Sequence, residues 1–218
     1  MNGVDPDMME KILVWLVPGI LAITLHECAH GWVAERFGDT TARDAGRLSL
    51  NPFRHIDPVG TILLPGLMLF AHMPFIFGWA RPVPVNFRQL KGGRWGVILV
   101  AAAGVLANLL MMIGWYISLV CLSLIAGFMP NVYVNLFAQG ALAGIVINLV
   151  LMLFNLIPIP PLDGGRVVGA LLPDALSKPY MRIEPYGIII LLLLIATGIF
   201  GRVFEPLLDA FLSGLGLT

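Results

Sequence analysis

Residues 96–128 read GVILVAAAGVLANLLMMIGWYISLVCLSLIAGF, a stretch without one charged side chain. About 20 apolar residues in a helix cross the ~30 Å hydrocarbon layer of a membrane, so this segment is long enough to span with some tilt. Residues 134–157 form a second stretch of the same kind. The two segments together predict a pair of membrane-spanning helices.

The composition of the whole chain agrees with a membrane protein. Of the 218 residues, 12% are charged and 58% are hydrophobic, whereas about one quarter of a soluble domain is charged. The 13 basic and 13 acidic residues give a net charge of zero without any basic run, which argues against nucleic acid as a partner. We therefore expect an α-helical multi-pass membrane protein, one domain over residues 1–218, in contact with the lipid bilayer.

Four other apolar segments are shorter or interrupted. In chain order they cover residues 11–37, 61–77, 187–200 and 203–217. The acidic N-terminus lacks the basic opening of a signal peptide, so the first of these segments is expected to be retained. The last two are expected to be accessory membrane helices within about residues 183–217, outside a core of about residues 11–170.

The first of these segments contains the pattern HECAH, which runs from His26 to His30. Residues four apart lie on one face of a helix, so the two imidazoles can bind one Zn²⁺ while Glu27 acts as general base on a water molecule. Ionisable groups that follow an apolar run are costly in lipid and mark functional sites. The alternative is a polar cluster whose hydrogen bonds neighbouring helices satisfy.

A third ligand is needed, because a catalytic zinc has three protein ligands and one open position. Residues 155–166 read NLIPIPPLDGGR, in which prolines end a helix and the two glycines permit a close backbone approach. Asp163 is the only carboxylate from residue 58 to residue 173, which makes it the best candidate. Otherwise, a lone aspartate at this place would cap the helix that follows.

These motifs resemble those of the site-2 proteases, the intramembrane zinc metalloproteases of peptidase family M50. The family carries HExxH on one membrane helix and N-x-x-P-x-x-x-x-D-G on another, and the second motif is matched in full by residues 155–164. The family's A-G-P-x-x-N element is matched by AGVLAN, residues 103–108, except that Val105 replaces the proline. The resemblance is to the compact branch without PDZ or CBS domains.

The resemblance implies a reaction and a set of site residues. The reaction is hydrolysis of peptide bonds within or near the transmembrane segments of single-pass membrane proteins, as in regulated intramembrane proteolysis, with one Zn²⁺ per chain. The implied residues are the metal ligands His26, His30 and Asp163, the catalytic base Glu27, and Asn108 and Asn155 for substrate binding or oxyanion stabilisation.

The fold that we expect is a site-2 protease core with short membrane-associated β-strands and one re-entrant segment. The extended-looking pieces at residues 47–50 and 82–85 are the candidates for the strands. For Asp163 to reach the histidines, segments 11–37 and 134–157 must run in the same direction. Segment 96–128 already crosses once between them, so residues 61–77 are expected to enter the membrane without crossing it.

Charge asymmetry predicts the orientation of the chain. With residues 61–77 re-entrant, most of the 13 basic residues lie on one side of the membrane, in residues 38–95 and 158–186. Basic loops face the cytosol. We therefore expect a protein of the cell membrane whose active site is nearer the cytosolic side.

A non-hydrolytic metal carrier or membrane scaffold is the alternative from another class. Transport favours ligands repeated in inverted halves, and the sequence has no second histidine pair. A prenyl-protein endopeptidase would share only the HExxH motif. His55 is expected to be a surface or interfacial histidine, and the two cysteines, Cys28 and Cys121, are expected to be packed and reduced.

Overall fold

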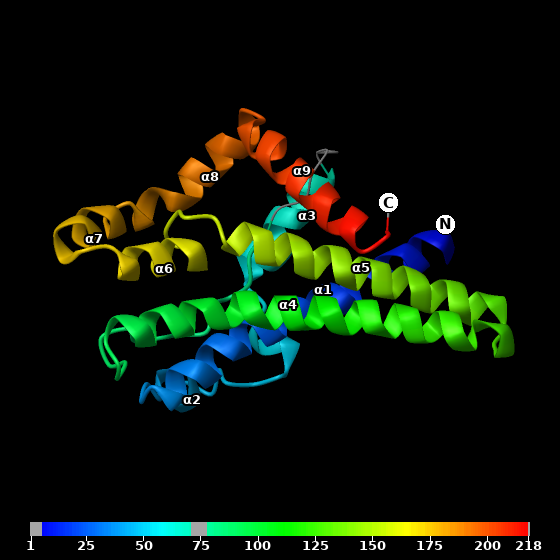
Figure 1. Ribbon diagram of the computed structural model, residues 1–218, viewed down its shortest axis with the longest axis horizontal. Helices are drawn as coiled ribbons and strands as arrows, with labels where there is room; N and C mark the ends of the chain where they lie inside the picture. Colours follow the sequence, from blue (N-terminus) through cyan, green and yellow to red (C-terminus); the bar gives the residue numbers. More distant parts are fainter. Residues whose placement is uncertain (1–5, 71–77, 218) are drawn as a thin grey trace.

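A computed structural model describes residues 6–70 and 78–217, and the regular secondary structure of this part of the chain is helical (Figure 1). The α-helices are α1 (Pro6–Arg36), α2 (Thr41–Asp44), α3 (Leu64–Phe70), α4 (Arg94–Ile125), α5 (Asn131–Asn155), α6 (Asp163–Leu171), α7 (Asp174–Met181), α8 (Gly187–Ala196) and α9 (Ile199–Gly214). A π-helical turn, Pro58–Leu63, precedes α3, and 3₁₀ turns occur at Pro52–Arg54, Ala126–Phe128 and Glu184–Tyr186.

Three helical stretches are long and apolar enough to cross a membrane: Arg94–Phe128, Asn131–Asn155 and Asp174–Ala196. The first two are α4 with its 3₁₀ end and α5, at the places where the sequence predicts membrane-spanning helices. The third joins α7 and α8. The expected multi-pass architecture is thus supported by helix length and composition.

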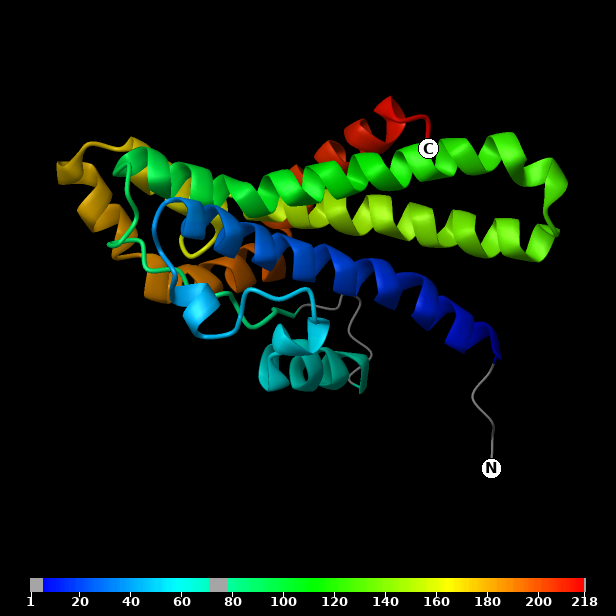
Figure 2. The same ribbon diagram turned by 90° about the horizontal axis from the view of Figure 1, so that it is seen from below.

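Helices α1, α4 and α5 form the central bundle (Figures 1 and 2). Both views show α1 and α5 running in one direction and α4 in the opposite direction, which is the arrangement that lets Asp163 reach the two histidines. Small residues such as Ala101 and Gly104 on α4 and Ala141 and Gly144 on α5 are buried, which lets membrane helices approach closely. Consequently the C-terminal half of α1 and the end of α5 reach the same region of the molecule.

Apolar side chains fill the contact between α4 and α5. The buried cluster consists of Val105, Met112, Ile145, Leu149 and Met152. Helix α9 folds back so that its leucines at positions 208 and 212 pack against this cluster. The turn before α9 occurs at Gly198, which has a left-handed φ of 72°, a conformation that glycine adopts at little cost.

The described part of segment 61–77 is a short helix. The π-helical turn and α3 fall among the apolar helices that are shorter than a membrane span, and Figure 2 shows them beside α1. Residues 71–77, which include His72, lie outside the described residues. The described residues of this segment form a helix too short to span the membrane, in agreement with the expectation. The re-entrant path of the whole segment stays a prediction.

The expectation of short β-strands at residues 47–50 and 82–85 is wrong, since neither piece is a strand in the structure. Side chains form hydrogen bonds with the backbone groups that would otherwise pair two β-strands. The N–H of Val83 donates to Oε2 of Glu27 at 2.8 Å, and the Arg47 guanidinium donates to the carbonyls of the two residues before Val83, at 2.8 and 3.3 Å. Prolines on both sides of Val83 have no N–H to offer.

Candidate metal centre

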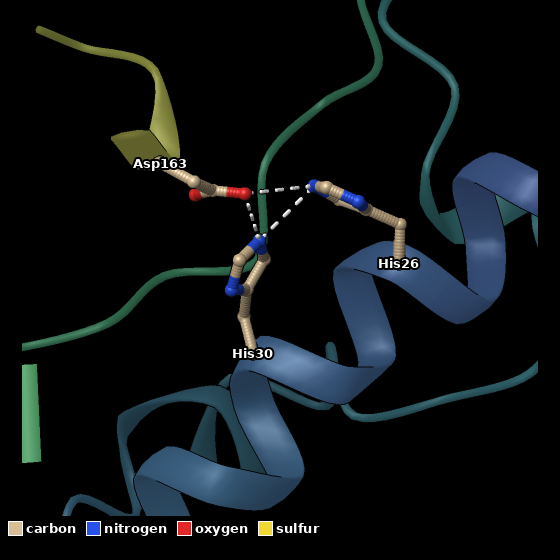
Figure 3. Close-up of side chains that lie close together, drawn as sticks. All are labelled: His26, His30 and Asp163. Atoms are coloured by element: carbon tan, nitrogen blue, oxygen red, sulfur yellow. Dashed lines mark hydrogen bonds and ion pairs between the residues drawn. The ribbon is translucent and has the colours of Figure 1, made fainter. Parts of the chain in front are cut away.

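His26 and His30 lie one turn apart on α1, and their rings meet at the Nε2 atoms, which are 3.1 Å apart (Figure 3). The rings are nearly perpendicular, with an interplanar angle of 84°. Both side chains come from the same face of the helix, as spacing by four residues dictates.

Asp163 reaches the two histidines from a separate part of the chain. Its Oδ2 lies 3.4 Å from Nε2 of His26 and 3.3 Å from Nε2 of His30 (Figure 3). It is the first residue of α6, and the N-cap position of that helix belongs to Leu162, so Asp163 is not the N-cap residue. The carboxylate is therefore directed at the histidines and does not cap its own helix.

The loop between α5 and α6 can place Asp163 there because glycine follows it. A Cβ on Gly164 would lie 2.3 Å from the carbonyl oxygen of Leu156, far inside van der Waals contact. The absence of a side chain thus lets the end of α5 and the start of α6 come together. This is the close backbone approach that the two glycines predict.

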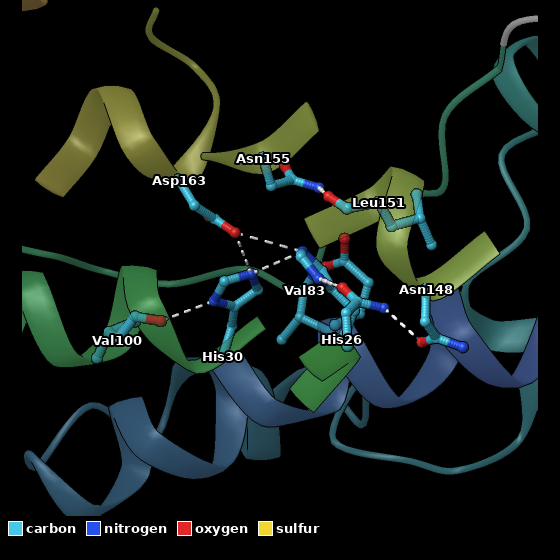
Figure 4. A network of polar contacts seen from close by, with 10 residues as sticks. His26, His30, Val83, Val100, Asn148, Leu151, Asn155 and Asp163 are labelled. Carbon is cyan, nitrogen blue, oxygen red and sulfur yellow. Dashed lines mark hydrogen bonds and ion pairs between the residues drawn. The ribbon is translucent and has the colours of Figure 1, made fainter. Parts of the chain in front are cut away.

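The other ring nitrogens determine which atoms are free to bind a metal. Nδ1 of His26 lies 2.6 Å from Oδ1 of Asn108, and Nδ1 of His30 lies 2.7 Å from the backbone oxygen of Val100 (Figure 4). Each oxygen accepts a hydrogen bond, so each Nδ1 carries the proton in a neutral ring, and Nε2 keeps its lone pair. Such outer partners are typical of metal-binding histidines.

Three acceptor atoms therefore converge without a donor between them. Asp163 is 8% exposed, and its Oδ2 is buried without a hydrogen-bond partner. Among the described residues, these three are the group that can hold a metal ion, with ligand atoms within 4.8 Å of one another. Because ligands about 2.0–2.1 Å from a tetrahedral zinc lie about 3.3–3.4 Å apart, the observed spacings fit Zn²⁺.

Gly104 of α4 provides room beside the ligand atoms. A Cβ there would lie 2.4 Å from Nε2 of His30 and 2.7 Å from Nε2 of His26. A larger residue would therefore occupy the space in which the ligands meet. In the sequence, Gly104 is the glycine of the AGVLAN element, and this motif is what marks the position.

Glu27 lies in a cleft next to these residues. The cleft has a volume of about 480 Å³, and its lining includes Glu27, the three candidate ligands and residues 79, 80 and 82–85 of the extended segment. One oxygen of Glu27 accepts the 2.8 Å hydrogen bond from the N–H of Val83. The backbone of the extended segment thus holds the carboxylate at the side of the cleft.

A second cavity of about 360 Å³ continues from this cleft between α1, α5 and α8, and it also has His26 and Glu27 in its lining. Most of its other lining residues are apolar, among them Ile23, Leu151 and Phe154. The two cavities share His26, Glu27 and Asn155 in their linings.

The two asparagines occupy different positions. Asn155 lines both cavities, and its Nδ2 donates to the carbonyl of Leu151 in its own helix at 2.9 Å. Asn108 is 0% exposed and lies between His26 and Asn148, so it presents no surface to a substrate in this structure. The sequence analysis did not single out Asn148. The only clue to this residue in the sequence is that it is an amide within an apolar segment.

Two smaller expectations are wrong. His55 is 3% exposed, and its Nε2 lies 2.7 Å from the carbonyl oxygen of Ser49 and 3.8 Å from Sγ of Cys28 on α1, so it is a buried residue. Cys28 is buried as expected, whereas Cys121 is exposed on α4, where the surface of a membrane helix faces lipid. Both cysteines are free thiols.

Comparisons with known proteins agree with this geometry. The model of peptidase family M50 matches residues 135–197. "Putative zinc metalloprotease YwhC" of Bacillus subtilis is 41% identical over 191 residues, which cover 88% of this chain and 84% of that protein. "Putative zinc metalloprotease Rip2" of Mycolicibacterium smegmatis is 26% identical over 211 residues, covering 95% of this chain and 76% of that protein.

The protein of the same name from Mycobacterium tuberculosis H37Rv is 27% identical over 192 residues, which cover 88% of this chain and 70% of that protein. No solved structure matches the chain. The similarity to the Bacillus protein extends over most of both chains. The chain belongs to peptidase family M50, the family of the site-2 proteases.

Proposed function

We propose that this protein is an intramembrane zinc endopeptidase that hydrolyses peptide bonds within or near the transmembrane segments of single-pass membrane proteins. The observation that supports this most directly is the convergence of Nε2 of His26, Nε2 of His30 and Oδ2 of Asp163 beside Glu27. A protein that only binds the metal would need the three ligands and no further carboxylate. A carboxylate in the same cleft has a purpose in hydrolysis.

The proposed roles follow from the chemistry of each group. When bound, zinc supplies a Lewis acid that activates water and polarises the peptide carbonyl. Glu27 takes a proton from the attacking water at a carboxylate oxygen and passes it to the leaving amine. His26, His30 and Asp163 would hold the metal through Nε2, Nε2 and Oδ2.

The substrate class follows from the surroundings of the cleft. Its continuation between α1, α5 and α8 is lined mostly by apolar residues, which suits a segment drawn from the hydrocarbon layer. A transmembrane helix hides its peptide carbonyls in internal hydrogen bonds. Cleavage therefore needs local unwinding, and residues that destabilise helices should favour it. Asn155, at the wall of both cavities, is the candidate to hydrogen-bond the unwound substrate.

We further propose that α1 crosses the membrane together with the three stretches that are long and apolar enough to do so. The protein then acts in the cell membrane as one domain, with the site nearer the cytosolic side. Regulated intramembrane proteolysis is the process that such a reaction serves.

The test uses the detergent-purified full chain and a single-pass membrane substrate. Removal of metal with a chelator should abolish cleavage, and Zn²⁺ should restore it. Glu27→Gln should bind zinc as the wild type does but cleave at least ~100-fold more slowly, because general acid–base catalysis contributes that much or more. Asp44→Asn, an exposed carboxylate change outside the cleft, is the matched control and should leave the rate unchanged.

Cleavage that survives the chelator would exclude a zinc mechanism. Stoichiometric zinc binding without hydrolysis of any single-pass substrate would instead favour a metal carrier.

A further inference from the structure

A chain of buried polar groups leads away from the metal centre into the apolar core. Nδ1 of His26 contacts Oδ1 of Asn108 at 2.6 Å, and Nδ2 of Asn108 donates to Oδ1 of Asn148 at 2.9 Å. Nδ2 of Asn148 in turn donates to the backbone oxygen of Gly144 at 2.8 Å. The chain thereby joins α1, α4 and α5.

Both amides are completely buried. Asn108 and Asn148 are 0% exposed and belong to helices whose other buried residues are almost all apolar. A buried amide is costly unless its hydrogen bonds are made, and helix packing alone could use an apolar side chain at either position. We therefore expect the two asparagines to do more than pack the helices together.

The direction of the chain is fixed at the end farthest from the metal. A backbone carbonyl only accepts, so Asn148 must present its NH₂ group to Gly144 and its oxygen to Asn108. Asn108 must then present its NH₂ group to Asn148 and its oxygen to His26. Nδ1 of His26 must therefore carry the proton, and Nε2 is left free as a ligand.

We propose that Asn148 is a positioning residue which, through Asn108, holds His26 in the tautomer that binds the metal. Without Asn148, the amide of Asn108 can turn and present its NH₂ group to His26. That arrangement favours a proton on Nε2, where the ligand lone pair is needed. His30 needs no such relay, because the backbone oxygen of Val100 accepts from its Nδ1 directly. The inference rests on the proposed metal site.

The first test measures zinc affinity by competition with a chromogenic chelator on the detergent-purified full chain. Asn148→Leu should weaken zinc binding about 10- to 100-fold, the usual loss when an outer partner of a ligand is removed. Asn135→Leu makes the same chemical change at an exposed position of α5, and its affinity should stay within about twofold of the wild type. An unchanged affinity in Asn148→Leu overturns the proposal.

A double variant separates positioning from packing. If Asn148 acts only through Asn108, the variant that carries both Asn108→Leu and Asn148→Leu should bind zinc no more weakly than Asn108→Leu alone. Losses of affinity that multiply would show that Asn148 acts on its own, and they would overturn the proposal.

A measurement on the wild type needs no substitution. In the metal-free protein, at a pH where the imidazole is neutral, the ¹⁵N chemical shifts of His26 should report a proton on Nδ1. A proton on Nε2 would overturn the relay. A wild type that binds no zinc at all would instead refute the ligand assignment and the proposed function with it, so the two failures are distinguishable.

Discussion

Gly104 lies where the metal centre has no room for an added side chain. A Cβ at this position would lie 2.4 Å from Nε2 of His30 and 2.6 Å from Cε1 of His26. Gly104→Ala should therefore push the rings out of their common geometry and weaken zinc binding by at least ~10-fold, which corresponds to about 1.4 kcal/mol. Zinc titration against a competing chelator measures this loss.

Gly114 offers the matched control on the same helix. A Cβ there would meet nothing within 4 Å, so Gly114→Ala should leave zinc affinity unchanged and leave stability unchanged or slightly raised, since alanine favours helix. Equal zinc affinity in both variants would show that the position of the α4 backbone does not constrain the histidines.

The sequence could predict the ligands but not the groups behind them. His26 and His30 share a helix face by spacing alone, and Asp163 stood out because no other carboxylate lies near it in the chain. Asn148 gave no such signal, because the partner of an amide in an apolar helix depends on how that helix is rotated against its neighbours. That rotation is a property of packing and does not appear as a motif.

At the scale of the elements, backbone hydrogen bonding explains why the predicted strands are absent. Residues 82–85 have the composition of an edge strand, yet Glu27 and Arg47 bind the backbone groups that a partner strand would need. A pattern of alternating residues indicates extended backbone. The pattern does not reveal which side chains form hydrogen bonds with the backbone groups that strand pairing needs.

Asp39 anchors the other end of this extended segment. It is 1% exposed, its Oδ2 accepts from the N–H of Asn86 at 2.6 Å, and its Oδ1 accepts from the N–H and the hydroxyl of Thr41. Burial alone would raise the pKa of Asp39, but these donors stabilise the carboxylate and hold the pKa below its ordinary value of 3.8. The turn after α1 is thereby fastened to the wall of the cleft.

This lowered pKa predicts how stability depends on pH. Since the folded pKa lies below the unfolded one, the contribution of Asp39 is complete above 3.8 and is lost as the pH falls through the lower folded value. Asp39→Asn should cost ~1–3 kcal/mol at neutral pH, because its NH₂ group opposes a buried N–H. Its melting temperature should also fall less than that of the wild type between about pH 5 and about pH 3.

Thermal unfolding of the purified protein in detergent measures both effects. The exposed Asp44→Asn change should reproduce the pH profile of the wild type. An Asp39→Asn variant with an unaltered slope would show that the anchor contributes nothing to acid stability.

At the scale of the whole molecule, the directions of three helices determine where the site can form. Asp163 meets the histidines because α1 and α5 run in the same direction with α4 opposite to them (Figure 2). The sequence could predict this, since only an odd number of crossings between the two segments allows the ligands to meet. The place of the C-terminal helices was harder to predict, because α9 folds back onto α5 through apolar contacts without a distinctive motif.

The same topology predicts which side of the membrane each loop faces. Arg88, exposed in the basic loop before α4, and Asn131, exposed where α5 begins, lie at opposite ends of α4 and should be separated by the bilayer. In a Cys121→Ser background, a membrane-impermeant thiol reagent should label Asn131→Cys in intact cells. It should label Arg88→Cys only after the membrane is opened, because basic loops face the cytosol. The background without an introduced cysteine is the control, since Cys28 is buried. Labelling of both positions from one side would mean that α4 does not cross, and the reverse pattern would place the site nearer the outer surface.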